Sequence, residues 1–196
     1  MEFGTSNLKG TAVVPVIQLF IKRYGVSAYK KLVASLSPNY QLLYIKHQDV
    51  MDGKLYPELS HIEMLEHIGK HYYPDRHPDD WLFDYMYAQM DYGMNQFYRI
   101  VIKLITLKTS PRFFATKSMK FWRRYHDTGN LYVVSGSNND LVAELHDFIG
   151  HNYEVSRSAI MNATKSVLIL SGAKNVTHKI KHFPNKATVE FSFFWD

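Results

Sequence analysis

The sequence predicts an α+β protein: a mainly helical part, residues 9–125, packs on a four-stranded antiparallel sheet with one inserted helix, residues 126–196. The apolar residues before Tyr125 recur at every third or fourth position, as in helices, whereas after Gly129 they alternate, as in half-buried strands. One helical pattern interrupts that alternation. With 196 residues, 46% of them hydrophobic, the chain has enough apolar material for a core and is expected to form one domain.

The first part reads as a short strand followed by helices. Residues 9–14 are apolar and β-branched, which predicts a strand, and residues 40–50 fit either a strand or a helix. Helices are expected over residues 15–24, 26–36, 57–72, 81–107 and 112–125. Gly25 is expected to end the first helix, and Asp79 or Asp80 to cap the long one.

The second part reads as two hairpins around a helix. Strands are expected over residues 131–134, 141–148, 176–183 and 187–195. Turns at residues 135–140 and at Pro184-Asn185 join them in pairs. The helix between the hairpins carries an apolar stripe; Ser156 is its expected N-cap, and Gly172 is expected to end it in the left-handed conformation.

Composition excludes several classes of protein. Without cysteine, the chain has neither disulfides nor thiolate metal sites. Its start lacks the pattern of a signal peptide, and no apolar run approaches the roughly 18 residues of a membrane span, so a cytoplasmic protein is expected. The net charge is +5, but the basic residues are scattered, which favours a solvated surface over a nucleic-acid site.

Several short motifs, in order, link the chain to a known family. They are Lys9-Gly10, Tyr56-Pro57, Gly93 with Phe97-Tyr98-Arg99, Pro111-Arg112, Trp122 with Tyr125-His126 and Gly129, and Phe193-Phe194-Trp195. In these features the chain resembles a family of paralogues that is abundant in myxobacteria and their predatory relatives and has no assigned activity. The resemblance covers nearly the whole chain.

The second half is similar, more distantly, to the fold shared by haem-NO-binding sensors, 4-vinyl-reductase-like domains and certain vesicle-tethering subunits. That similarity implies a pocket between helices and an antiparallel sheet. A haem sensor of this fold would carry a proximal His and a Tyr-x-Ser-x-Arg motif that holds the propionates. Here Tyr153 and Arg157 have the right spacing, but Val155 stands where Ser belongs and Ser156 follows it. No haem or other cofactor is therefore expected.

Aromatic and methionine side chains of the predicted long helix are candidates for the wall of an apolar pocket, with ordinary core packing as the alternative. The candidate ligand-binding residues are Tyr85, Met90, Met94, Phe97, Tyr98, Arg99, Trp122 and Tyr125. Among them, Arg99 would contact the head group of an acidic ligand.

Histidines provide the other candidate sites. His67 and His71 are four residues apart on a predicted helix, so they could share a metal ion, with His61 nearby. The zinc-protease pattern is absent because Ile68, rather than Glu, follows His67. His126 and Asp127 are neighbours, which suggests a catalytic pair, but consecutive helical residues point about 100° apart, and a helix end is the alternative.

These observations favour a non-enzymatic regulatory or signalling module that binds a small apolar or acidic molecule, or a protein. The alternative is a metalloprotein or enzyme that uses the region of His61, His67 and His71. The closing strands carry many rings, among them Phe191, Phe193, Phe194 and Trp195, so a homodimer that covers them is expected. Contact through helices instead of the sheet stays open.

Overall fold

The computed structural model describes residues 6–93, 120, 122–170 and 172–196. The helical elements are α1 (Gly10–Ser35), α2 (Pro38–Tyr44), η1 (His47–Asp49), α3 (Glu58–Tyr72), α4 (Pro78–Gly93), η2 (Ile149–Asn152), α7 (Glu154–Leu170) and η3 (Pro184–Lys186). The strands are β1 (Asn7–Lys9), β2 (Leu55–Pro57), β3 (Asn130–Gly136), β4 (Asp140–His146), β5 (Thr177–Phe183) and β6 (Thr188–Phe194). The predicted α+β class, with helices first and a four-stranded antiparallel sheet last, is confirmed.

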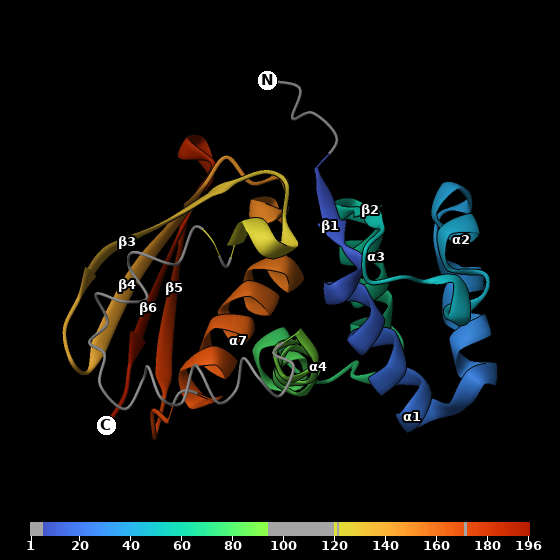
Figure 1. The fold of residues 1–196 in the computed structure, drawn as a ribbon, viewed down its shortest axis with the longest axis horizontal. Coiled ribbons are helices and arrows are strands. Elements are labelled where there is room, and N and C mark those ends of the chain that lie inside the picture. The colour runs from blue at the N-terminus through green and yellow to red at the C-terminus, as the bar shows by residue number, and fades with distance from the viewer. Residues whose placement is uncertain (1–5, 94–119, 121, 171) are drawn as a thin grey trace.

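Figure 1 shows these elements as successive layers, from the sheet through α7 and α4 to α1 and α3, with α2 on the far side. The sheet has the order β3-β4-β6-β5, and every neighbouring pair is antiparallel. Its strands alternate as expected: Val189, Phe191 and Phe193 of β6 are buried, whereas Phe194 is 42% exposed. None of the described helices combines the length and apolar character that a membrane crossing requires.

Two apolar cores meet at residues 122–126. The helical core contains Tyr125, and the core beneath the sheet contains Trp122 together with Phe148. Since α7 contributes Ala159 to the helical core and Met161 to the sheet core, it separates the two.

The predicted strand over residues 9–14 is wrong, because the helix α1 begins at Gly10. Consecutive residues from Ala12 to Ile17 are buried, so this apolar run is a helix enclosed on all sides, a pattern that periodicity alone does not separate from a strand. The strand β1 lies just before it and pairs with β2. Gly25 interrupts α1 at a positive φ of 83°, and the helix resumes after it.

Other sequence expectations are met in part. The helix expected from residue 57 is α3, and the ambiguous segment 40–50 is helical in α2 and η1. Ser156 is not an N-cap, since α7 begins two residues earlier and Ser156 is buried in its first turn. Gly172 has the expected positive φ. The helix predicted over residues 81–107 is described as far as Gly93, and its remainder lies outside the described residues. Of the helix predicted over residues 112–125, residues 120 and 122–125 are described, and they are helical.

Candidate functional site

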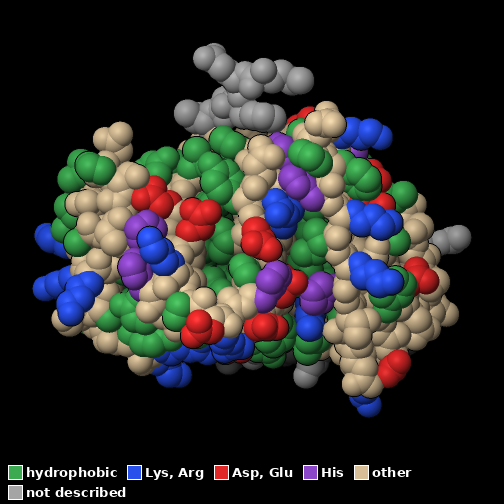
Figure 2. Space-filling view, turned by 180° about the vertical axis from the view of Figure 1, so that it is seen from behind, with side chains coloured by type: hydrophobic (Ala, Val, Ile, Leu, Met, Phe, Trp, Pro, Cys, Tyr) green, Lys and Arg blue, Asp and Glu red, His purple; other side chains and the backbone are tan. Residues whose placement is uncertain are grey.

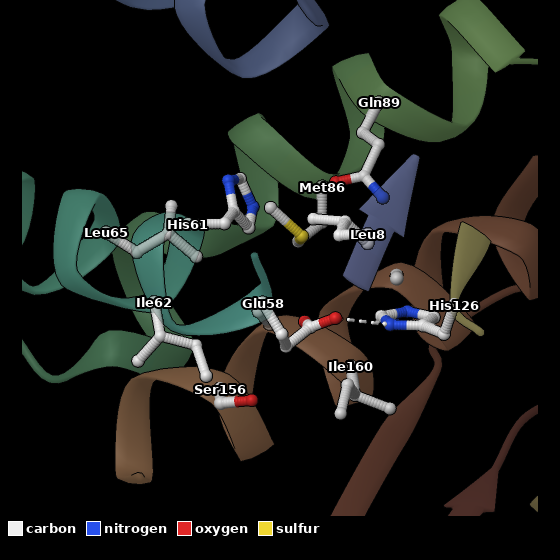
Figure 3. A pocket seen from close by; sticks show the side chains of 12 residues that line it. Leu8, Glu58, His61, Ile62, Leu65, Met86, Gln89, His126, Ser156 and Ile160 are labelled. Atoms are coloured by element: carbon white, nitrogen blue, oxygen red, sulfur yellow. Dashed lines mark hydrogen bonds and ion pairs between the residues drawn. The ribbon is translucent and has the colours of Figure 1, made fainter. Parts of the chain in front are cut away.

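A small cavity of about 40 Å³ lies where the helical part meets residues 122–128. Figure 3 shows Leu65 and His61 on α3, Met86 and Gln89 on α4, and Ile160 on α7 arranged around it. Leu8 of β1, Glu58, Ile62, His126, Ser156, Ala159 and Ala163 complete the lining. Most of these side chains are apolar, so the few polar ones determine what the cavity can bind.

Glu58 and His126 form a buried pair at this cavity. Glu58 Oε2 lies 3.0 Å from His126 Nδ1, and the two side chains are 4% and 13% exposed. Glu58 is held in place because it is the first residue of α3 and its backbone N–H donates to the carbonyl of Ser6 at 2.9 Å. A buried carboxylate is stable only when it has such a partner.

The ring of His126 is fixed by aromatic neighbours. It stacks on Trp122, with centroids 3.8 Å apart and planes 9° apart, and it meets the Phe148 ring edge-on at 5.5 Å. The Trp122 indole N–H donates to the carbonyl of Thr128 at 2.6 Å, which sets the plane of the stack. His126 is therefore held rigidly against Glu58.

Two further polar side chains at the cavity each have an atom that could form an additional hydrogen bond. His61 Nδ1 and Gln89 Oε1 are buried and have no hydrogen-bond partner among the described residues. The side chains are 5% and 6% exposed. Burial lowers the pKa of His61 to about 4, an effect that the His126 ring reinforces and Glu58 opposes, so the imidazole is neutral at pH 7. A neutral imidazole nitrogen and an amide oxygen can each accept a hydrogen bond from a bound molecule.

A second cavity of about 100 Å³ adjoins the first. The two share the side chains Gln89, His126, Ile160 and Ala163. The second is completed by Met90, Trp122, Tyr125, Leu131, Thr164 and Val167. Three of the residues predicted to line a pocket, Met90, Trp122 and Tyr125, are thus brought together.

Of the other predicted pocket residues, Tyr85 is the one within the described ranges, and it does not line either cavity. Tyr85 is fully buried; its ring packs edge-on against Trp81, and the Arg23 guanidinium lies 5.3 Å from the centre of the ring. It belongs to the core, as the alternative reading expected. Met94, Phe97, Tyr98 and Arg99 fall outside the described residues.

The predicted histidine pair on α3 is separate from the cavity. The rings of His67 and His71 have centroids 5.8 Å apart, while His61 faces the cavity instead. Across the described ranges, no three His, Cys, Asp or Glu side chains are placed to hold a metal ion. His126 and Asp127 do not act as a pair either: Asp127 Oδ1 accepts the backbone N–H of Asn7 at 2.6 Å, and His126 turns to Glu58.

Sequence reasoning missed Glu58, Gln89 and Leu8. The role of Glu58 could not be predicted, because an acidic residue at the start of a helix normally faces solvent and interacts favourably with the helix dipole. Gln89 sits among the methionines and tyrosines of α4 with nothing in its spacing to mark it. Only the pairing of β1 with β2 places Leu8 beside Glu58.

Neither of the two cavities has the volume of a haem site. Pockets for cofactor-sized ligands measure about 300–1,000 Å³, well above the volumes of the two cavities. Of the residues that resemble the propionate motif, Ser156 lines the first cavity, whereas Arg157 lies in a different groove and donates to the carbonyl of His151 at 2.8 Å. These two side chains therefore cannot hold one propionate group together.

No protein-family model matches the sequence, and neither does any curated protein. The fold is similar to several solved structures. An H-NOX protein from K. algicida has a TM-score of 0.64 at 12% identity, with 96% of each chain covered. An H-NOX protein from S. oneidensis in its Fe(II)NO state has a TM-score of 0.63 at 10% identity, covering 96% of this chain and 99% of that one.

A third similar structure is an oxygen-binding H-NOX domain related to soluble guanylate cyclases. Its TM-score is 0.61 at 6% identity, and 96% of this chain and 95% of that chain are covered. The agreement extends over nearly the full length of all three, which bears out the expected similarity to the haem-NO-binding fold. At these sequence identities, the comparison supports a shared fold and does not indicate a shared function. The chain has the H-NOX fold.

Proposed function

We propose that this chain is a non-enzymatic regulatory module that binds a small, mainly apolar molecule in the two adjoining cavities. One observation carries the proposal: His61 Nδ1 and Gln89 Oε1, both buried and without a described partner, face a small apolar space. Unsatisfied buried acceptors are costly, so their presence at a cavity supports a bound group that donates to them.

The size and polarity of the cavities define the ligand class. A dry cavity of about 150 Å³ in another protein binds benzene, and the two cavities here, about 40 and 100 Å³, are of that order. The apolar side chains of Met90, Leu131 and Val167 would contact the body of the ligand. A single N–H or O–H on the ligand would reach His61 or Gln89. Phenol and indole have this combination of properties.

The position of the cavities supports a regulatory role. Their walls include Leu8 of β1, the Glu58–His126 pair and the stacked Trp122, which join the helical part to residues 122–128. A ligand that fits one arrangement of this junction better than another would shift the population of the two. Similarity in fold to H-NOX proteins, one in an Fe(II)NO state and one in complex with oxygen, also supports a sensor role. In this proposal, the ligand binds without haem.

The test uses phenol and indole as probes, with thermal unfolding as the readout. Both probes are expected to raise the melting temperature of the wild-type protein in a concentration-dependent way. Ala163→Phe fills the space shared by the cavities and should abolish that rise, and Ala163→Leu should reduce it. Ala34→Phe, which adds the same ring to an exposed position on α1, is the matched control and should respond as wild type.

Two outcomes would contradict the proposal. One is the absence of stabilisation by either probe, and the other is equal stabilisation of wild type and Ala163→Phe when both are folded by circular dichroism. Haem is tested separately, by expression with excess haem precursor. Purified protein is expected to lack a stoichiometric haem absorption band, and a full band that survives gel filtration would overturn the claim that the ligand binds without haem.

A further inference from the structure

A polar groove of about 340 Å³ lies apart from the two cavities, where the beginnings of α4 and α7 meet β5. Its lining includes His77, Asp79, Glu154, Arg157, His178 and His182. Its volume falls within the range of about 300–1,000 Å³ typical of small-molecule sites. Figure 2 shows histidine and acidic side chains gathered near the middle of the face that it views. The proposed function makes no use of this groove.

Arg157 brings a positive charge to the groove that no described carboxylate neutralises. One of its N–H groups, on Nη1, donates to the carbonyl of His151 at 2.8 Å. Within the described residues, none of the ion pairs involves Arg157. A guanidinium has five N–H donors in a planar fork that matches two oxygens of a carboxylate or a phosphate.

Two histidines add donors beside this guanidinium. His151 Nδ1 and His182 Nε2 lie 3.3 Å apart, so one of the two rings donates to the other. The pKa of each is lowered, first by burial and then by the charge of Arg157. The lowered pKa values support the geometric observation that positive charge is in excess at this end of the groove.

The acidic groups of the groove lie close to histidines at its other end, although Asp79 Oδ1 has no hydrogen-bond partner among the described residues. Asp79 Oδ2 lies 3.5 Å from His178 Nε2 and 3.6 Å from His77 Nδ1. Glu154 Oε1 lies 3.1 Å from His77 Nε2. The acids thus face histidines, whereas Arg157, His182 and Lys179 carry donors that an anion in the groove could use.

We propose that this groove binds a small oxyanion, a carboxylate or a phosphate group, in the fork of Arg157 with His182 as a second contact. A bound anion favours the protonated form of His182 and of His151, so binding is tighter at pH 6 than at pH 8. The other groups that line the groove around His182 are Lys179, His77, His178, Asp79 and Glu154. The positive charge of Lys179 favours a bound anion and disfavours protonation of His182, and the carboxylates of Asp79 and Glu154 have the opposite effects.

The test titrates inorganic phosphate and acetate, in separate series at constant ionic strength, into ¹⁵N-labelled full chain. Amide shifts are expected in residues 151–158 and 177–182 with both anions. The pH dependence is measured with acetate, which is ionised at both values, and its affinity is expected to be several-fold higher at pH 6 than at pH 8. Arg157→Gln should weaken binding at least tenfold, since it removes the charge-assisted fork. Arg157→Lys keeps the charge without the fork and should give an intermediate loss. Lys186→Gln, on the exposed turn η3, removes one positive charge elsewhere and should bind as wild type.

The two titrations also separate the two ligand sources, because a site that prefers phosphate saturates at lower phosphate than acetate. His182→Gln provides a second variant and should remove most of the pH dependence while leaving part of the affinity. Binding that is unchanged in Arg157→Gln, or shifts spread evenly over the basic surface, would overturn the proposal. Absence of any saturable shift with either anion at pH 6 would do the same, and none of these results bears on the cavity ligand.

Discussion

Glu58 Oε2 lies 3.0 Å from His126 Nδ1, although 68 residues separate them in the chain. The first begins α3 in the helical part, and the second follows the short helical segment that leads to the sheet. Both are largely buried, so this pair links the two halves of the fold at the wall of the cavity.

Removing the carboxylate of this pair should destabilise the protein markedly. In Glu58→Ala the buried His126 loses its partner, and a loss of about 3 kcal/mol in the free energy of unfolding is expected, measured by urea denaturation. Glu58→Gln retains a hydrogen-bond acceptor and should lose less. Asp75→Ala, an exposed acidic residue, is the control and should change stability by under about 0.5 kcal/mol. Equal stabilities of Glu58→Ala and this control would show that the pair contributes nothing.

Gly10 permits a close approach between α1 and the segment before β2. A Cβ at this position would lie 1.8 Å from the carbonyl oxygen of Met51, which is backbone and cannot move aside as a side chain can. Gly10→Ala should therefore cost about 3 kcal/mol of unfolding free energy or prevent folding, with thermal unfolding as the measurement. Gly53→Ala is the control, because nothing lies within 4 Å of its Cβ. Wild-type stability of Gly10→Ala would contradict the packing described here.

The buried His61 should make stability depend on acid pH. Its pKa is lowered to about 4 in the folded protein, chiefly by burial, against about 6.5 when unfolded. Between these values the unfolded state binds a proton that the folded state does not. Stability is therefore fully present above pH 6.5 and falls by roughly 3 kcal/mol as the pH decreases to about 4.

The check is the difference in unfolding free energy between pH 7 and pH 4.5 for wild type and His61→Gln. The wild-type difference should be the larger, whereas His71→Gln, at an exposed position of α3, should behave as wild type. The pKa values of His151 and His182 are lowered as well, so these residues also reduce stability at acid pH in all three proteins. The role of His61 is therefore measured by the difference between the pH profiles of wild type and His61→Gln. Parallel pH profiles for wild type and His61→Gln would rule out this role.

The outer face of the sheet retains the predicted capacity for self-association. Phe194 is 42% exposed, and Val134 and Tyr132 on β3 are exposed at 57% and 50%. A homodimer that buries them is expected, and sedimentation velocity at tens of micromolar should give about twice the 22.9 kDa of one chain. Phe194→Ser should shift the mass toward one chain. A wild-type species of one chain at every concentration would exclude the dimer, and an unaffected dimer in Phe194→Ser would place the contact elsewhere.

The sheet was predictable because its signal is local. Each strand of the second half shows its own alternation, and the hairpin turns at residues 135–140 and at Pro184-Asn185 set which strands pair. By contrast, residues 12–17 are all buried, which removes the periodicity that distinguishes a helix from a strand.

The candidate site was predictable only in part, for a related reason. Met90, Trp122 and Tyr125 are large apolar residues of the kind that line pockets, and the structure brings them together. Glu58 and His126 meet because β1 pairs with β2 on one side and bridges Leu8 to His126 on the other. Nothing within a short window of sequence encodes that relation.

The three-residue strand β1 also has a consequence for the order of folding. The backbone N–H of Asn7 and its side-chain amide donate to the Asp127 carboxylate at 2.6 and 2.7 Å, and Ser6 bonds to Thr128, across about 120 residues of chain. Closing a loop of that length costs conformational entropy before the stabilising contacts have formed. These bonds are therefore expected to form after the local hairpins and helices. During synthesis, β1 can pair with β2 early, but the bonds from residues 6 and 7 to residues 127 and 128 can form only after residue 128 has left the ribosome.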